Sequence, residues 1–314
     1  MTLLHPSAMP YRRNRRMHRA LARLHLTVVA CAIAVVACSD VKSRTDVVDS
    51  ARQTVANVQA RVVPSSVWAS GDSLKLVGPD SAFRVHFTTA AKPEVARYAR
   101  FLAAGVAANE TFFKSRYPKS FDVYVYDHRS ALDSGLRSVF KDTAYASPCW
   151  LAAIGEAEGV YMLAPVRWES ETCEGRYTTY SDTTKTGRLF THELTHVLNA
   201  QILSAQGRRY GTDDIAWFRE GVAMLVAGQL GAPEQRAVRA ALKAGSVPTS
   251  LNAIANLADV GLRYNLMGSL AQHIDRTFGR TTLKALMSLD TQAAILSTLG
   301  VSEKDFLAAW RQSS

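Results

Sequence analysis

The chain has 314 residues, about two domains' length at the usual domain size. Hydrophobic residues make up 47% and charged residues 20%, which excludes a disordered, collagen-like or polytopic membrane protein and allows a sizeable core. The formal net charge of +10 is the unusual property, because so basic a balance is typical of proteins that bind nucleic acid or a membrane surface.

Most of this charge lies in residues 1–38. That stretch contains no acidic residue and six arginines, and without it the net charge of the chain falls to +4. The arginines are Arg12, Arg13, Arg15, Arg16, Arg19 and Arg23. Residues 39–314 contain no basic stripe interleaved with aromatic residues, so we expect no nucleic-acid partner.

Residues 1–38 have the organisation of an export signal. An apolar run follows the arginines, too short to cross a hydrocarbon core of about 30 Å but suited to a signal peptide. It ends in Val35-Val36-Ala37-Cys38, which resembles the bacterial lipobox, whose cysteine is lipidated and becomes the mature N-terminus. The resemblance implies a lipid anchor on Cys38 and a place on the bacterial envelope, at the periplasmic face of the outer membrane in a Gram-negative cell. A plain cleaved signal or an uncleaved anchor is the alternative.

The sequence after the predicted signal, residues 39–314, predicts an α+β fold. Residues 39–70 are polar and are expected to form a tether, and from Thr186 the pattern is helical almost to the end. Between them, alternating or dense β-branched and aromatic residues predict strands, and apolar residues at helical spacing predict one helix. The strands are Ser73–Val77, Phe83–Thr88, Phe121–Tyr126 and Gly159–Leu163, the helix is Pro93–Lys114, and Cys149–Glu158 is a loop. We expect a small mixed β-sheet with a helix in residues 71–185 and a mostly helical part in residues 186–314.

Two cysteines remain after the signal, Cys149 and Cys173. In an oxidising compartment we expect them to form a disulfide, which would stabilise the fold by about 3 kcal/mol on the chain-entropy model. Two free buried thiols are the alternative. Metal binding by these cysteines is not expected, because neither has a CxxC partner.

The motif whose side chains could carry out chemistry is His192-Glu193-Leu194-Thr195-His196, in a predicted helix over about Arg188–Leu203. A spacing of four residues places both imidazoles on one helix face, where they can hold one cation. Glu193 is rotated by about 100° from His192 and is free to act on water. The plain alternative is a solvated polar face with two incidental histidines. Against it, the chain after residue 38 has only five histidines, and two have this spacing.

A third ligand is available downstream. The segment Ile215–Ala227 is apolar nearly all round and predicts a buried helix, yet it contains Glu220. A buried unpaired carboxylate is costly, and coordination to a metal would remove that cost. The adjacent Gly221 would allow another helix to approach closely. An ion pair of Glu220 with Arg219 or another arginine is the alternative.

His-Glu-Leu-Thr-His, followed by the Trp-Phe-Arg-Glu-Gly that begins at Trp217, resembles the gluzincin zinc metallopeptidases. In particular it resembles the peptidase MA-like group, with its HExTH helix and its W-x-x-E-G-x-A helix. The resemblance implies a zincin-like helical subdomain in which His192, His196 and Glu220 bind one zinc ion and Glu193 is the general base. It also suggests Tyr264 as a second stabiliser of the oxyanion, because relatives often place a tyrosine in that downstream helix. The alternative is a tyrosine at a helix end that packs on the core.

Partners for the outer nitrogens of the ligand imidazoles are less evident. Asn199 and Asp213 or Asp214 are the candidates. Thermolysin-type enzymes have an aspartate four residues after the glutamate ligand, whereas this chain has Met224 there. A lone histidine further on, His273, is expected to be structural.

These residues predict a membrane-tethered zinc metallopeptidase that hydrolyses peptide bonds outside the cytoplasm, with a peptide or protein as substrate. The alternative is a non-catalytic zinc-binding lipoprotein that has the same ligands, a blocked cleft and a scaffolding role in the envelope.

Overall fold

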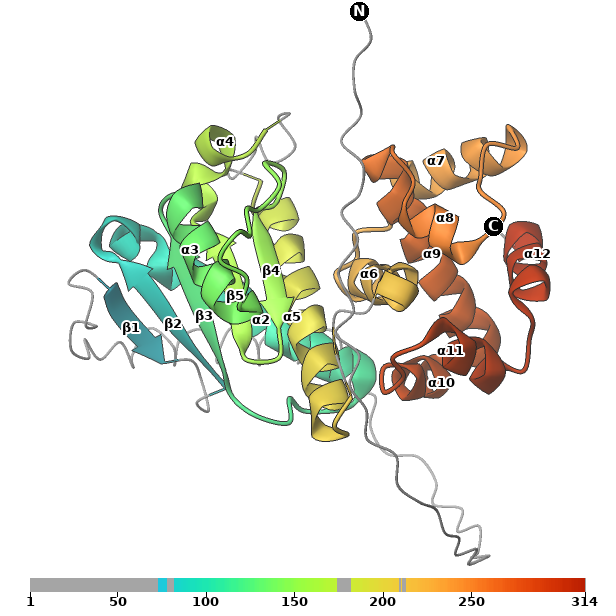
Figure 1. Ribbon diagram of the computed structural model, residues 1–314, viewed down its shortest axis with the longest axis horizontal. Helices are drawn as coiled ribbons and strands as arrows, with labels where there is room; N and C mark the ends of the chain where they lie inside the picture. Colours follow the sequence, from blue (N-terminus) through green and yellow to red (C-terminus); the bar gives the residue numbers. More distant parts are fainter. Residues whose placement is uncertain (1–72, 78–81, 174–181, 209, 211–212, 314) are drawn as a thin grey trace, which may run out of the picture. The chain divides into compact units, whose positions relative to one another are not determined.

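The structure is a computed structural model that describes residues 73–77, 82–173, 182–208, 210 and 213–313 (Figure 1). All of these lie in the second of two compact units, residues 42–314. The predicted signal peptide with Cys38 and the predicted tether lie outside the described residues. Among the helices that are described, none is both long and apolar enough to span a membrane.

Five strands form one mixed sheet in the order β1-β2-β3-β5-β4. The central three are parallel, and the two edge strands are antiparallel to their neighbours. The strands are β1 (Ser73–Val77), β2 (Phe83–Thr88), β3 (Phe121–Tyr126), β4 (Ala153–Glu156) and β5 (Gly159–Leu163). Val123 of β3 pairs with Val85 of β2 and Val160 of β5, which sets the central register. Four of the five strands have the predicted bounds.

The prediction of a loop over Cys149–Glu158 is wrong, because β4 forms inside this range and pairs with β5. Ala-Ile-Gly-Glu contains only one residue that favours strands, so propensity gives little sign of it. The prediction of a single helix before Thr186 is also wrong, because α3 (Arg129–Phe140) and the short α4 (Trp168–Glu171) form there as well.

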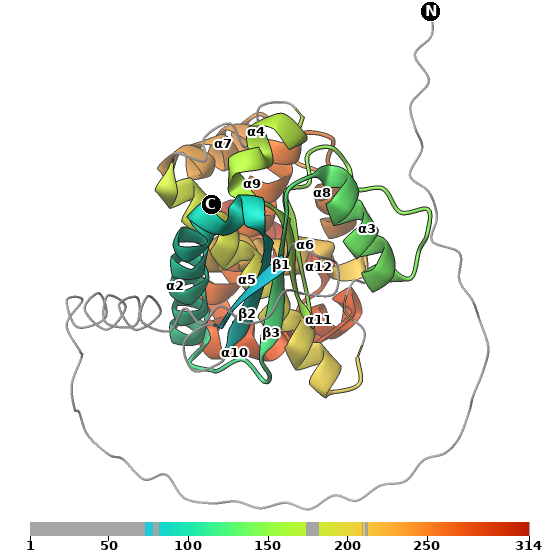
Figure 2. The ribbon, with the colours of Figure 1, turned by 90° about the vertical axis from the view of Figure 1, so that its left-hand side faces the viewer.

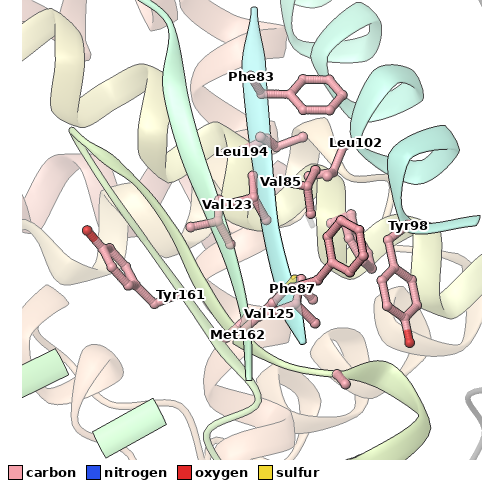
Figure 3. Packing of buried hydrophobic residues seen from close by; sticks show 14 of the residues in the cluster. Phe83, Val85, Phe87, Tyr98, Leu102, Val123, Val125, Tyr161, Met162 and Leu194 are labelled. Carbon is pink, nitrogen blue, oxygen red and sulfur yellow. The ribbon is translucent and has the colours of Figure 1, made fainter. Parts of the chain in front are cut away.

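One face of the sheet is covered by α2 (Val95–Phe113) and α5 (Thr183–Ala205). Phe83, Val85 and Val123 share a buried cluster with Leu102 of α2 and Leu194 of α5 (Figure 3). Their burial removes apolar surface from water at about 25 cal/mol per Å², which fixes the helices to the sheet. In Figure 2, α3 lies on the other side of the sheet from α2.

A disulfide and one arginine fix the loop between α3 and β4. Cys149 and Cys173 are bonded, which ties this loop to the residues after α4. The guanidinium of Arg129 donates to the Ser147 hydroxyl and to four backbone oxygens at 2.6–3.0 Å, those of Pro148, Cys149, Leu151 and Glu171. The loop is therefore held at several points before it enters β4.

The rest of the described chain is helical and has its own core around Trp217, Leu270 and Trp310. Its helices are α6 (Ala216–Val226), α7 (Ala232–Lys243), α8 (Leu251–Ala255), α9 (Val260–Phe278), α10 (Arg280–Leu286), α11 (Gln292–Leu299) and α12 (Glu303–Ser313). On α5, Leu194 belongs to the core against the sheet and Leu198 to this second core. The predicted α+β fold, a small mixed sheet followed by a mostly helical part, is confirmed.

Candidate metal centre

The His-Glu-Leu-Thr-His motif lies in the middle of α5, which begins earlier than the sequence pattern indicated. The carboxylate of Asp182 accepts hydrogen bonds from the backbone N–H groups of Thr184 and Lys185, both at 3.0 Å, and so caps the helix at Thr183. Because both cores pack on α5, His192 and His196 are buried, with 5% and 7% of their surface exposed.

Glu220 comes to these histidines from α6. A Cβ atom on its neighbour Gly221 would lie 2.3 Å from the backbone oxygen of Met267 in α9, so the two helices can approach this closely only at a glycine. The predicted close approach at Gly221 is confirmed. Within the described part of the chain Glu220 pairs with the two imidazoles and not with Arg219.

The three side chains converge on one point. The distance from Nε2 of His192 to Oε2 of Glu220 is 3.2 Å, and from Nε2 of His196 to the same oxygen it is 3.4 Å. The two Nε2 atoms are 3.1 Å apart. This buried group of two imidazole nitrogens and one carboxylate oxygen could hold a metal ion.

Burial and mutual attraction oppose each other in this group. Burial alone would raise the pKa of Glu220, but the imidazoles of His196 and His192 hold it well below its usual value of 4.5. Burial would likewise lower the pKa of His192, yet the hydrogen bond to Glu220 and the charge of Glu193 raise it above 6.5. Each of these two groups therefore favours the charged form of the other. A bound cation would replace the imidazole proton as the positive partner of the carboxylate.

Neutral side chains hold the outer nitrogens of both imidazoles. Nδ1 of His192 donates to Oε1 of Gln229 at 2.8 Å, and Nδ1 of His196 is 2.8 Å from the hydroxyl of Tyr210. The oxygen of Gln229 can only accept, so Nδ1 of His192 carries the proton and Nε2 keeps its lone pair for a metal, whereas the Tyr210 hydroxyl can donate or accept and orients the His196 ring. Sequence reasoning missed both partners. In the sequence, Gly228 before Gln229 was the local sign of a turn that could direct a side chain back to α5, and the structure has that glycine at φ of +62°.

Glu193 lies beside the ligand group and is 7% exposed. Burial raises the pKa of its carboxyl from 4.5, and the imidazoles with a hydrogen bond from the backbone N–H of Gly155 offset part of that rise. Gly155 is in β4, and a Cβ there would lie 2.2 Å from the backbone oxygen of Glu193 and 2.9 Å from Cβ of His196. The edge strand is therefore packed directly against the motif.

A cavity of about 810 Å³ adjoins these residues. Its wall includes the three ligands, Glu193, the strand β4 and, from α9, Tyr264, whose ring centre is 6.3 Å from that of His192. A further part of the wall is aromatic, formed by Phe140, Tyr145, Trp150 and Trp168. The fold thus brings Tyr264 to the same cavity as the motif, although the two are about seventy residues apart in the sequence.

The other candidate partners lie elsewhere. Asn199 donates to the backbone oxygen of Met287 at 2.6 Å, and Asp214 accepts from the backbone N–H of Gln292 at 2.7 Å, so the expectation that they support the ligands is wrong. The side chain of Asp213 lies outside the described residues. His273 is buried outside this cavity, with Nδ1 2.8 Å from the Ser313 hydroxyl, in agreement with a structural role.

Comparisons with protein-family models, curated proteins and solved structures found no match to this chain. The geometry itself defines a class: an α+β protein with a buried two-histidine, one-carboxylate group that could hold a metal ion at the wall of a cavity. A finer statement of function depends on the chemistry of these residues.

Proposed function

We propose that this chain is a zinc-dependent metallopeptidase of the gluzincin type. The observation that carries the proposal is the convergence of His192, His196 and Glu220, with ligand atoms 3.1–3.4 Å apart, beside the buried Glu193. A tetrahedral zinc ion with bonds of about 2.0–2.1 Å holds its ligand atoms about 3.3 Å apart, so one ion fits the group as it stands. Two imidazoles and a carboxylate are also a ligand set of hydrolytic zinc.

Each nearby side chain has a distinct task in peptide hydrolysis. Bound zinc supplies a Lewis acid that polarises the substrate carbonyl and acidifies water. Glu193, which is not among the three ligands, accepts a proton from the attacking water and delivers it to the leaving amine. Tyr264, on the α9 wall of the cavity, donates a hydrogen bond to the oxyanion that develops on the carbonyl.

The cavity supports a catalyst acting on a peptide. A scaffold with a blocked cleft would have no need of about 810 Å³ beside the ligands. The strand β4 is at the edge of the sheet and lines this cavity, and an extended peptide can add to a strand edge through backbone hydrogen bonds.

We place the activity outside the cytoplasm, on a lipid anchor at Cys38. The basic and apolar sequence of residues 1–38 supports export, and so does the Cys149–Cys173 disulfide, since structural disulfides persist in oxidising compartments.

The proposal can be tested with the purified full chain. It should bind one zinc ion, and His192→Ala should lose most of it, whereas His128→Ala, at an exposed histidine, should not. Glu193→Gln should keep zinc while hydrolysis of a quenched fluorescent peptide mixture falls by about 10²–10⁴-fold. Zinc binding without any Glu193-dependent hydrolysis would support the scaffold, and failure to bind zinc after loading would refute the metal site.

A further inference from the structure

Among the charged side chains of the cavity wall that have no task in peptide hydrolysis as proposed, Arg219 has the most unusual surroundings. Its guanidinium carbon lies 4.8 Å from the ring centre of Tyr210, in a cation–π contact. Its Nε atom is buried and has no hydrogen-bond partner among the residues that the structure describes. None of the ion pairs formed by the described residues includes it.

A guanidinium in this situation favours an anionic partner. It cannot give up its proton, so partial burial without a counter-charge has a cost that the tyrosine ring offsets only in part. Glu156 also lines the cavity and influences Arg219 through space, yet the two form no ion pair. By contrast, Arg188 lines the same cavity but is exposed, so water can solvate its charge.

Arg219 is also close to the candidate metal centre, to which it is linked in two ways. It directly precedes the ligand Glu220 in α6. The Tyr210 ring that contacts it carries the hydroxyl that lies 2.8 Å from Nδ1 of the ligand His196. A group bound by Arg219 is therefore near the bond that the centre would act on.

We propose that Arg219 binds a carboxylate of the substrate, so that the chain prefers peptides with a carboxylate close to the scissile bond. This inference rests on the proposed peptidase function and adds the substrate class. The carboxylate is either the C-terminus of the peptide or an Asp or Glu side chain, since both offer the paired oxygens that a guanidinium binds bidentately.

The inference can be tested by measuring peptide binding to a variant that is not expected to hydrolyse the peptide. Zinc-loaded full chain with Glu193→Gln would be titrated by calorimetry with peptides that differ in one group: a C-terminal acid against its amide, and internal Glu against Gln. We expect one carboxylate peptide to bind at least about tenfold more tightly than its neutral counterpart, and the pair that shows it identifies the source. Adding Arg219→Gln should abolish the difference, and Arg219→Lys should retain part of it.

Two controls separate this inference from its alternatives. Arg188→Gln removes the same charge from an exposed arginine of the same cavity, and an equal loss of preference would overturn a specific role for Arg219. Equal binding of the acid and neutral peptides, or no binding of either, would also overturn it. Hydrolysis is assayed separately with Glu193 intact, so carboxylate-selective binding without hydrolysis would refute the peptidase and uphold Arg219. If Arg219→Gln lacks zinc, the comparison rests on Arg219→Lys.

Discussion

Both candidate ligand imidazoles are held at Nδ1 by a neutral oxygen, that of Gln229 for His192 and that of Tyr210 for His196. Such a partner fixes the orientation of the ring, and the Gln229 oxygen, which can only accept, also fixes the tautomer of His192. It does so without the additional negative charge that a carboxylate would bring into a site that already contains Glu193 and Glu220. The imidazoles of this candidate site are therefore held in place although the position four residues after Glu220 is Met224 and not an aspartate.

At Gln229 we predict a change in zinc affinity. Gln229→Leu removes the oxygen that holds His192, so zinc affinity should fall by about 10–100-fold in a competition titration with a chromophoric chelator. Gln229→Glu keeps an acceptor at the same place and should bind zinc at least as tightly as the wild type. Unchanged affinity in Gln229→Leu would mean that packing alone orients the imidazole.

At Glu193 we predict a pH-dependent change in stability of the metal-free chain. Burial raises the folded-state pKa of Glu193 above its usual value of 4.5, so its contribution to stability is present below pH 4.5 and is lost as the pH rises through the folded-state value. Glu193→Gln stays neutral and should therefore become more stable than the wild type as the pH rises through the folded-state pKa of Glu193. Thermal unfolding of both proteins from pH 4 to 8 measures the difference in stability between them. A difference that does not change with pH would contradict a raised pKa of Glu193.

Secondary-structure elements meet at the site at separations that only glycine permits. Gly221 lets α6 approach α9, which places Glu220 at the cavity, and Gly155 lets β4 approach α5 at the motif. Any side chain at these positions would displace the element that positions a functional group. The two glycines therefore control distances between elements without themselves carrying chemistry.

Gly155→Ala tests this at the β4–α5 contact. The added methyl would lie 2.2 Å from backbone, which cannot rotate away, so β4 must shift at a cost of about 1–3 kcal/mol in unfolding free energy. Zinc affinity should fall too, because the shift displaces Glu193 and His196. Gly261→Ala, where the nearest heavy atom is 3.5 Å from the new Cβ, should change stability by no more than about 0.5 kcal/mol. Denaturant unfolding of both variants decides whether the close contact matters.

In the compact unit as a whole, the site draws on both parts of the fold. α5 packs on the sheet through Leu194 and on the helical core through Leu198, and its motif faces a cavity walled by both parts. The loop before β4 contributes Trp150 to that wall and is attached twice, by the disulfide and by Arg129. The two attachments are chemically independent, because one is covalent and the other consists of hydrogen bonds.

Removal of the disulfide should therefore reduce stability without affecting the metal centre. Cys149→Ser with Cys173→Ser should lower the unfolding free energy by about 3 kcal/mol, the chain-entropy value for a loop of this length. Arg129 should keep the loop in place, so that zinc stoichiometry stays at one. Loss of zinc in this double variant, measured by metal analysis of the folded protein, would show that the disulfide is needed to assemble the site.

Local sequence patterns determined much of this protein. Period-two alternation located β3, apolar spacing located α2, and the four-residue spacing of His192 and His196 placed both imidazoles on one helix face, because these periodicities depend only on backbone geometry. The choice of Glu220 also came from the sequence, since a carboxylate in an apolar helix needs a partner.

Tertiary structure alone decided what holds the ligands in place. Gln229 is 37 residues from His192, and Tyr210 is 14 residues from His196, and no periodicity relates residues across such turns. β4 forms because β5 offers it an edge and Gly155 fits against α5, not because Ala-Ile-Gly-Glu favours a strand. The sequence by itself selected the groups that could hold a metal, whereas packing between distant elements selected their supports and shaped the cavity beside them.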